Sequence, residues 1–341
     1  MECPDSGSDS FSINCSLDNC TEETITKHET EIRDWVAGIF LLMVCVTGLI
    51  GNSMVIFVVL RYAKMKTVTN LYILNLAIAD DLFMIALIFL SIATLVGNKW
   101  IFGPILCHVV LAIDGLNQFT SVFCLTAMSM DRYVAVCHAR RVRGYRTLRL
   151  AICVNIGVWF LALAAASPMN IVTRYTDNDG TPLCYFDFLS VFGKANVDIT
   201  QKLFMIYTSL MGLVIPLFII SVCYSSIVVR LKKLGTRTGK MKKSRKVNRL
   251  VFFVVLAFFM CWWPFYVWRT VVVFVPSLMK RWFNGLVIDF TMCLGYLNSC
   301  ANPLLYGFLS GNFKKSFRKA WNCTQETEIQ NGQRRAPAQP M

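Results

Sequence analysis

Seven long apolar segments are the feature of this sequence that most constrains its fold. At about 1.5 Å rise per residue, each can cross a hydrocarbon core of about 30 Å as a helix. A spanning segment must satisfy its own backbone hydrogen bonds, and no strand-like alternation indicates a β-barrel. The sequence therefore predicts an all-α membrane protein, a seven-transmembrane helix bundle. The predicted spans are residues 35–60, 71–96, 106–135, 150–171, 203–229, 250–275 and 283–309.

Composition and charge exclude other classes of protein. Of the 341 residues, 55% are hydrophobic and 16% are charged, whereas soluble domains carry about 25% charged residues. Lys and Arg gather in the connections after spans one, three and five and after span seven, while nine Asp or Glu residues precede residue 35. This distribution predicts a multi-pass plasma-membrane protein with its N-terminus outside and its C-terminus in the cytosol. We expect the basic side to face anionic membrane lipid and to bind no nucleic acid.

The chain is predicted to have four parts: an extracellular N-terminal tail (1–34), the seven-transmembrane domain (35–309), an amphipathic membrane-surface helix (310–323) and a cytoplasmic tail (324–341). The first residues do not form a charged segment followed by a short apolar one, so we expect no cleaved signal peptide. Prolines lie within spans four to seven, and we expect them to kink those helices rather than end them. They are Pro168, Pro216, Pro264 and Pro303.

Two covalent features are predicted on the outer side. The sequons that begin at Asn14 and Asn19 are predicted to be glycosylated. Cys107 begins span three and Cys184 lies in the outer connection before span five, so both face the oxidising side and we expect a disulfide between them. The pairing of the three cysteines in the N-terminal tail stays open.

A polar stripe runs down span three. Asp114, Asn117, Gln118 and Ser121 follow at helical spacing and therefore share one face. Charge inside a bilayer is costly, so this face must point into the bundle. Asp114 is either neutralised by an interhelical hydrogen bond or is the counter-ion for a cationic ligand, and its position in the outer third of the span favours the ligand.

A second polar group is predicted in the middle of the bundle. Asp80 lies midway along span two, and Asn298 and Asn302 lie on span seven. If the spans cluster, these side chains converge with Asn117 and Ser121. Their oxygens could bind a monovalent cation such as sodium, and the alternative is a water-filled hydrogen-bond network around a protonated Asp80.

Motifs in nearly every span resemble those of the rhodopsin-like G-protein-coupled receptors. Span three ends in Asp131-Arg132-Tyr133, and the other motifs occur in the family's order. They are Gly51-Asn52, residues 76–80, Trp159, Pro216 with Tyr224, residues 261–266, and Asn302-Pro303 with Tyr306. Stretches 61–84, 114–136 and 298–317 resemble the somatostatin and opioid branch, nearest the somatostatin receptors.

The resemblance implies a role for each group of residues. Asp114 would pair with a positive group of the ligand, Asp80 and its neighbours would hold an allosteric sodium ion, and no other cofactor is expected. Trp262, Phe265 and Tyr266 either pack in the core or form an aromatic wall around a cation. The predicted ligand-binding set is Asp114, Gln118, Trp262, Phe265, Tyr266, Arg269 and Tyr296, and the predicted sodium site is Asp80, Asn117, Ser121, Asn298 and Asn302.

The sequence also departs from the pattern of its relatives. Ile88, Ala93 and Ala139 replace residues that relatives usually have, and Arg269 stands where relatives carry an Asn. Arg269 would repel a basic group and attract an acidic one. We therefore expect a peptide ligand that presents one charge to Asp114 and the opposite charge to Arg269.

The resemblance further implies an activation switch. On activation Arg132 would leave Asp131, and the inner half of span six would swing out about Pro264 to admit a heterotrimeric G protein of the inhibitory class. Ser316, Thr324 and Thr327 offer sparse sites for receptor kinases and arrestin, and Cys323 is predicted to be palmitoylated. The predicted switch residues are Asp131, Arg132, Tyr133, Val122, Pro216, Tyr224, Phe258, Pro264, Pro303 and Tyr306.

Other functions fit the sequence less well. No internal repeat indicates a secondary transporter, span seven holds no lysine for a retinal Schiff base, and no metalloprotease, hydrolase or P-loop motif indicates an enzyme. A receptor for a small amine is the nearest alternative, because Asp114 suits either ligand.

Overall fold

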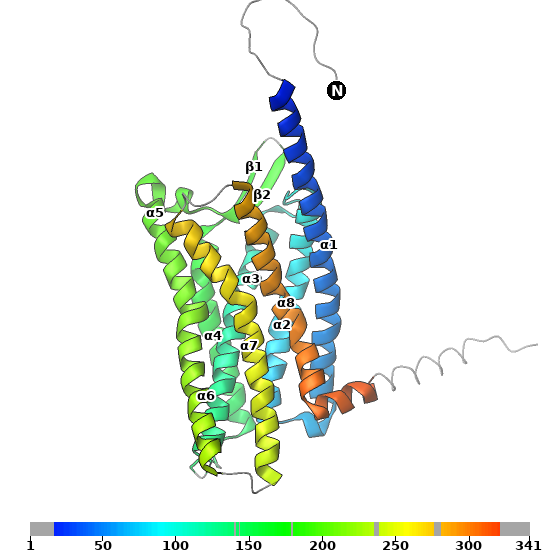
Figure 1. The fold of residues 1–341 in the computed structure, drawn as a ribbon, viewed down its shortest axis with the longest axis vertical. Helices are drawn as coiled ribbons and strands as arrows, with labels where there is room; N and C mark the ends of the chain where they lie inside the picture. The colour runs from blue at the N-terminus through cyan, green and yellow to red at the C-terminus, as the bar shows by residue number, and fades with distance from the viewer. Residues whose placement is uncertain are drawn as a thin grey trace, which may run out of the picture.

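The structure is a computed structural model that describes residues 17–139, 141–142, 144–178, 180–234, 239–275 and 281–320. Its long helices run side by side in one bundle (Figure 1). A further helical segment covers residues 311–320. The elements are α1 (Leu17–Arg61), the 3-10 turn η1 (Ala63–Met65), α2 (Val68–Leu95), α3 (Gly103–Cys137), α4 (Leu148–Val172), β1 (Thr173–Asn178), β2 (Thr181–Phe186), α5 (Phe188–Ser209), the π-helix η2 (Leu210–Val214), α6 (Ile215–Leu234), α7 (Gly239–Phe274) and α8 (Arg281–Leu309).

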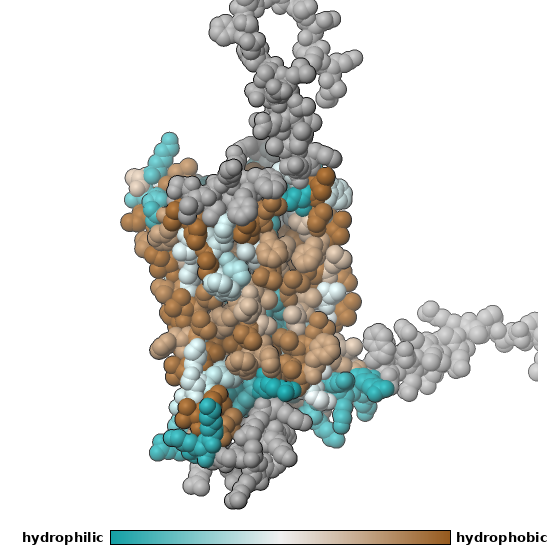
Figure 2. Space-filling model, in the orientation of Figure 1, coloured by the Kyte–Doolittle hydropathy of each residue, from teal (hydrophilic) through white to brown (hydrophobic). Residues whose placement is uncertain are grey.

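These elements confirm the predicted seven-helix bundle, with the run α5–η2–α6 as the fifth span. Within the described residues, six helical stretches are long and apolar enough to cross a membrane. The seventh, α8, has 29 residues and packs against α1 and α7. Hydrophobic residues cover the middle of the visible face, and hydrophilic residues gather toward the end that carries segment 311–320 (Figure 2).

The fifth span differs most from a regular helix. It contains the π-helix η2 directly before Pro216, the second residue of α6. Proline lacks an N–H group and clashes with the carbonyl one turn earlier, and a π-bulge relieves such a mismatch. The first part of α5 also bends at Gly193, whose φ is 71°. The other three prolines, Pro168, Pro264 and Pro303, lie inside helices as predicted.

The first helix begins at Leu17, well before the predicted span at 35–60. The additional residues include four Glu, which are good helix formers. They extend the helix beyond its apolar part. The stretch that is apolar enough to cross a membrane begins only at Thr30.

A β-hairpin that the sequence analysis did not predict lies between α4 and α5. β1 and β2 pair antiparallel, with Asn178 opposite Thr181. Gly180, which directly precedes β2, has a positive φ of 76°, a conformation that tight hairpin turns require. The structure joins Cys184 of β2 to Cys107 of α3 by a disulfide, the pair expected from the sequence. The hairpin is thereby held at the outer end of α3.

Polar contacts between helices fix the inner part of the bundle. Trp159 of α4 donates to Asn75 of α2 at 2.7 Å, and Asn52 of α1 donates to the carbonyl of Ser299 in α8 at 3.0 Å. A Cβ atom built on Gly51 would lie 2.9 Å from the ring of Pro303, so glycine permits the close approach of α1 and α8.

Candidate functional site

The seven residues of the predicted ligand-binding set line one cavity in the outer half of the bundle. Asp114 and Gln118 come from α3, Arg269 comes from α7, and Tyr296 comes from α8. The cavity has a volume of about 80 Å³. The structure therefore brings together residues from three helices that the sequence separates by up to 182 positions.

Asp114 and Arg269 place opposite charges in this cavity without forming an ion pair. Among the described residues, none of the ion pairs includes either side chain. The Nε atom of Arg269 is buried and has no hydrogen-bond partner among those residues. Its guanidinium lies 5.7 Å from the ring centroid of Phe265, a cation–π distance. Both side chains thus line the cavity without an ion-pair partner among the described residues.

An aromatic cluster forms one wall of the cavity. The rings of Trp262 and Phe265 pack edge to face with centroids 5.8 Å apart, and Tyr266 lies 6.4 Å from Trp262. Gly295 of α8 faces this cluster, and a Cβ atom there would meet the Trp262 ring at 3.2 Å. The predicted aromatic residues therefore pack against one another and also line the cavity, while their role around a cationic ligand stays a prediction.

Sequence reasoning missed six residues that line the same cavity. Most are apolar residues in apolar helices, where nothing in the sequence marks them, and Phe186 comes from the unpredicted hairpin. They are Met169, Phe186, Phe204, Met205, Thr208 and Met292.

A second cavity of about 320 Å³ lies beside the first, and Met292 and Tyr296 line both. Its charged residues form a network in which Arg33 contacts Asp34 at 3.1 Å and Asp289 at 3.5 Å. Ala93, one of the departures noted in the sequence, also lines this cavity. The outer part of the bundle thus offers more space than the Asp114 cavity alone.

The predicted sodium-site residues are all buried, and hydrogen bonds connect several of them. Asn302 donates to Oδ2 of Asp80 at 2.9 Å, Ser121 donates to Asn117 at 3.3 Å, and Asn117 donates to Ser299 at 3.3 Å. Ser299 was not predicted, because one serine in an apolar helix carries little signal. The structure therefore brings side chains from α2, α3 and α8 into one buried polar cluster.

Three oxygens of this cluster have no hydrogen-bond partner among the described residues. They belong to Asp80 (Oδ1), Asn298 (Oδ1) and Asn302 (Oδ1). Buried polar atoms are normally satisfied, and carboxylate and amide oxygens are the ligands that hard cations prefer. The donor set of the cluster therefore fits a small hard cation.

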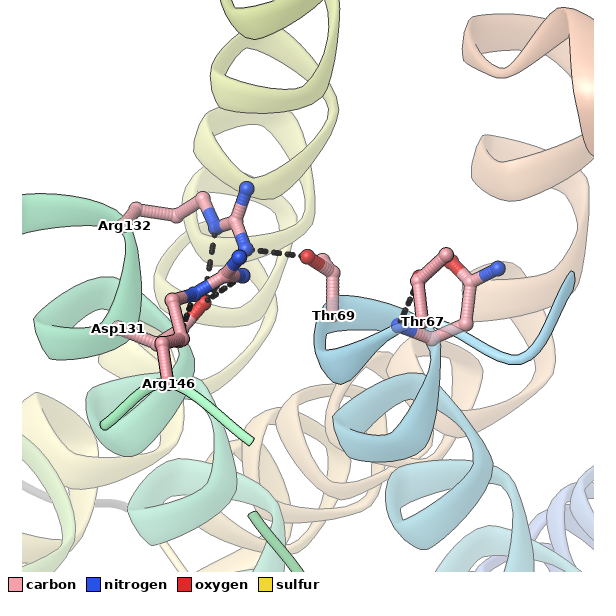
Figure 3. Close-up of polar contacts among 6 residues, drawn as sticks. Thr67, Thr69, Asp131, Arg132 and Arg146 are labelled. Atoms are coloured by element: carbon pink, nitrogen blue, oxygen red, sulfur yellow. Dashed lines mark hydrogen bonds and ion pairs between the residues drawn. The ribbon is translucent and has the colours of Figure 1, made fainter. Parts of the chain in front are cut away.

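Asp131 and Arg132, at the inner end of α3, form the ion pair expected of a closed switch. Arg132 donates to Oδ2 of Asp131 at 2.5 Å from Nη2 and at 3.2 Å from Nε. Arg132 also donates to the hydroxyl of Thr69, near the start of α2, which Thr67 caps (Figure 3). Asp131 additionally binds Arg146 from the connection before α4. The sequence analysis assigned no role to Thr69 or Arg146.

Several other predicted switch residues are buried or pack against neighbouring rings. Val122 and Phe258 are fully buried in the same apolar cluster, and Pro216 is buried where α6 begins. The ring of Tyr224 packs on Phe252 and that of Tyr306 on Phe313. Tyr133 packs on His138, away from this cluster.

Several predicted sites lie outside the described residues. They include the sequon at Asn14 and the palmitoylation site Cys323, while the side chain of Asn19 is also not described. Glycosylation and palmitoylation therefore stay predictions. Of the surface helix, the described segment 311–320 buries Phe313 and packs Phe317 against the bundle.

The sequence is similar to known receptors over most of its length. Residues 51–306 match the family described as "7 transmembrane receptor (rhodopsin family)". The somatostatin receptor type 2 of Mus musculus is 44% identical over 86% of this chain and 78% of its own length. That of Sus scrofa is 41% identical over 95% of this chain and 87% of its own length. The somatostatin receptor type 5 of Rattus norvegicus is 45% identical over 82% of this chain and 76% of its own length.

Proposed function

Because the chain belongs to the rhodopsin family of seven-transmembrane receptors, which are receptors and not enzymes, we propose that it is activated by an extracellular peptide and signals through an inhibitory heterotrimeric G protein. The observation that carries the proposal is the pair of opposite charges, Asp114 and Arg269, that line one outer cavity and form no ion pair among the described residues. An uncompensated buried charge is costly, so each is expected to be compensated by the ligand.

The two charges favour a peptide over a small amine. An amine needs only the Asp114 carboxylate and would be repelled by Arg269. A peptide can offer a basic side chain to Asp114 and a carboxylate to Arg269, and Arg binds a carboxylate in a bidentate way. The relatives are named as somatostatin receptors. We therefore expect a peptide ligand that presents a basic group to Asp114 and an acidic group to Arg269.

A sodium ion is proposed as an allosteric cofactor. Asp80, Asn117, Ser121, Asn298 and Asn302 would hold it, since the cluster contains three buried oxygens that lack a partner among the described residues. The ion would supply a positive charge that offsets the Asp80 carboxylate. Sodium and the agonist would favour different states of the receptor, so each would lower the affinity for the other.

The inner part of the bundle supports the proposed coupling. When the ligand presses on the aromatic wall, Val122 and Phe258 repack, Arg132 leaves Asp131, and the inner end of α7 moves away from α3. The C-terminal helix of the G protein then fills the opened groove. The N-terminus is proposed to lie outside the plasma membrane and the C-terminus inside, where receptor kinases, arrestin and membrane lipid meet the tail.

The experiment that tests the anchor role replaces Asp114 by Asn. Cells that express the parent or the variant are treated with somatostatin and with a library of short peptides that combine a lysine with a carboxylate. Inhibition of cyclic AMP is the readout. We expect Asp114→Asn to lower the potency of the active peptide by about 100-fold or more, because the partner charge is lost.

The matched control is Asp198→Asn, which removes an exposed carboxylate of α5 that pairs with Lys202 one helical turn away. It should retain the potency of the parent. Unchanged potency of Asp114→Asn at equal surface expression would reject the anchor role. Responses to small amines, but to no peptide, would favour the alternative of an amine receptor.

A further inference from the structure

Asp131 binds two guanidinium groups, and the second one holds it with better geometry. Arg146 donates from Nε to Oδ1 at 2.7 Å and from Nη2 to Oδ2 at 2.8 Å, which uses both oxygens. Both bonds from Arg132 end on Oδ2. Figure 3 shows the two arginines meeting on one carboxylate. Parallel bonds of the kind that Arg146 makes are the strong form of an arginine–carboxylate pair.

The two arginines compete for the same acceptor. Asp131 supplies one negative charge to two positive charges, and Nη2 of Arg146 and both nitrogens of Arg132 share its Oδ2 atom. Repulsion between the guanidiniums weakens the hold of Asp131 on Arg132. Hydrogen bonds to Asp131 also hold the pKa of Arg146 above its usual value, so Arg146 stays charged at any physiological pH.

Burial makes the second arginine important once the first one leaves. The Asp131 side chain is only 8% exposed, whereas Arg146 is 31% exposed at the edge of the bundle. A buried carboxylate that loses its only counter-ion is strongly destabilised. With Arg146 in place, Asp131 keeps a bidentate partner after Arg132 has gone. The departure of Arg132 therefore does not strand a buried charge.

The position of Arg146 does not depend on the helices that move. Its backbone N–H donates to the carbonyl of Val142 at 3.1 Å, and the next residue, Thr147, caps α4. Within the described part of the chain, Asp131 is the carboxylate with which Arg146 forms an ion pair. Arg146 is thus fixed by α4 and directed at Asp131.

We propose that Arg146 is a positioning residue that takes over the charge of Asp131 when Arg132 leaves it, and so lowers the free-energy cost of activation. This inference rests on the proposed G-protein coupling, because it concerns the step in which Arg132 is released. The proposal predicts that Arg146 stabilises the active state relative to the resting state. If Arg146 instead stabilised the resting state, it would oppose activation.

The test measures nucleotide exchange on a purified inhibitory G protein by the full-length receptor in lipid nanodiscs, without ligand. We expect Arg146→Gln to lower basal exchange by about 5- to 10-fold, the usual size of such couplings. Arg146→Lys, which keeps the charge, should restore part of it. The matched control Arg149→Gln removes an exposed arginine of the same region that does not bind Asp131, and it should leave exchange unchanged.

A double variant separates this role from a merely structural one. Asp131→Asn removes the buried charge, so Arg146→Gln should have no further effect in that background. Higher basal exchange of Arg146→Gln would overturn the proposal, and so would an equal loss with and without Asp131. If the parent and Asp131→Asn both fail to activate every class of G protein, the proposed function is contradicted along with this inference. If the parent catalyses nucleotide exchange but Arg146→Gln gives either of the two contradicting results, only the inference about Arg146 is overturned.

Discussion

The outer cavity and the inner switch treat buried charge in opposite ways. In the outer cavity, Asp114 and Arg269 share one space but no ion pair with a described residue. At the inner end of α3, Asp131 binds Arg132 and Arg146 with four hydrogen bonds. The outer charges are proposed to pair with a ligand, whereas the inner charges pair with one another within the chain. In the proposed mechanism, the cost of burying an unpaired charge favours ligand binding at one end and keeps Arg132 on Asp131 at the other.

The largest expected effect compares the two carboxylates directly. Asp131→Leu leaves two guanidiniums without their partner, and we expect it to lower the free energy of unfolding by about 3 kcal/mol. Asp114→Leu removes a charge that forms no ion pair with a described residue, and we expect a change of less than about 1 kcal/mol. Thermal unfolding of the purified receptor in detergent, followed with a thiol-reactive dye, measures both. Equal losses for the two variants would contradict the comparison.

The next effect sharpens the role of the outer cation. Arg269→Asn should lower the potency of peptides with a free carboxylate by about tenfold, because a charge-assisted hydrogen bond is lost. Peptides in which that carboxylate is amidated should respond equally to the parent and the variant. Inhibition of cyclic AMP by matched acid and amide peptides provides the measurement. An equal loss for both forms would assign Arg269 to packing against Phe265 alone.

Much of this arrangement could be predicted from the sequence. Segment length and apolar character gave the spans, and helical spacing placed Asp114, Asn117, Gln118 and Ser121 on one face of α3. Polar and aromatic residues stand out in aliphatic helices, so the predicted ligand-binding set contains no aliphatic residue. The residues that were missed, such as Met169 and Phe204, look like any other core residue.

Features that depend on the path of the chain could not be predicted. Arg146 lies 15 residues after Asp131, in the connection between α3 and α4, and no local rule fixes its approach to that carboxylate. Thr69 meets Arg132 only because α2 packs beside α3. The π-helix before Pro216 and the bend at Gly193 arise from local strain that periodicity does not record. Such contacts are set by tertiary packing and loop geometry.

A smaller effect is expected for the polar cluster that lies between the two regions. Replacing KCl by NaCl should stabilise the parent receptor by about 1 kcal/mol, because an ion that binds the folded state raises its stability. Asp80→Asn should abolish that difference. Thermal unfolding in the two salts at equal ionic strength measures it. The same sodium effect in Asp80→Asn would place the ion elsewhere, and no effect in the parent would reject the site.

The smallest effect concerns the aromatic wall through which the outer cavity meets the switch. In Gly295→Ala the new methyl group would lie 3.2 Å from Trp262, so the ring must shift by a few tenths of an ångström. We expect a loss of about 0.5 kcal/mol in stability, because crowding outweighs the helix propensity gained. Gly157→Ala is the matched control, since its methyl group meets nothing within 4 Å and should stabilise α4 by a similar amount. Because Trp262 lies between the ligand cavity and Phe258, Gly295→Ala should also change peptide potency, and Gly157→Ala should not. If the two alanine variants have the same effect on unfolding and on potency, then Trp262 can shift without cost. In that case the aromatic wall does not couple the ligand cavity to the ion pair of Asp131 and Arg132.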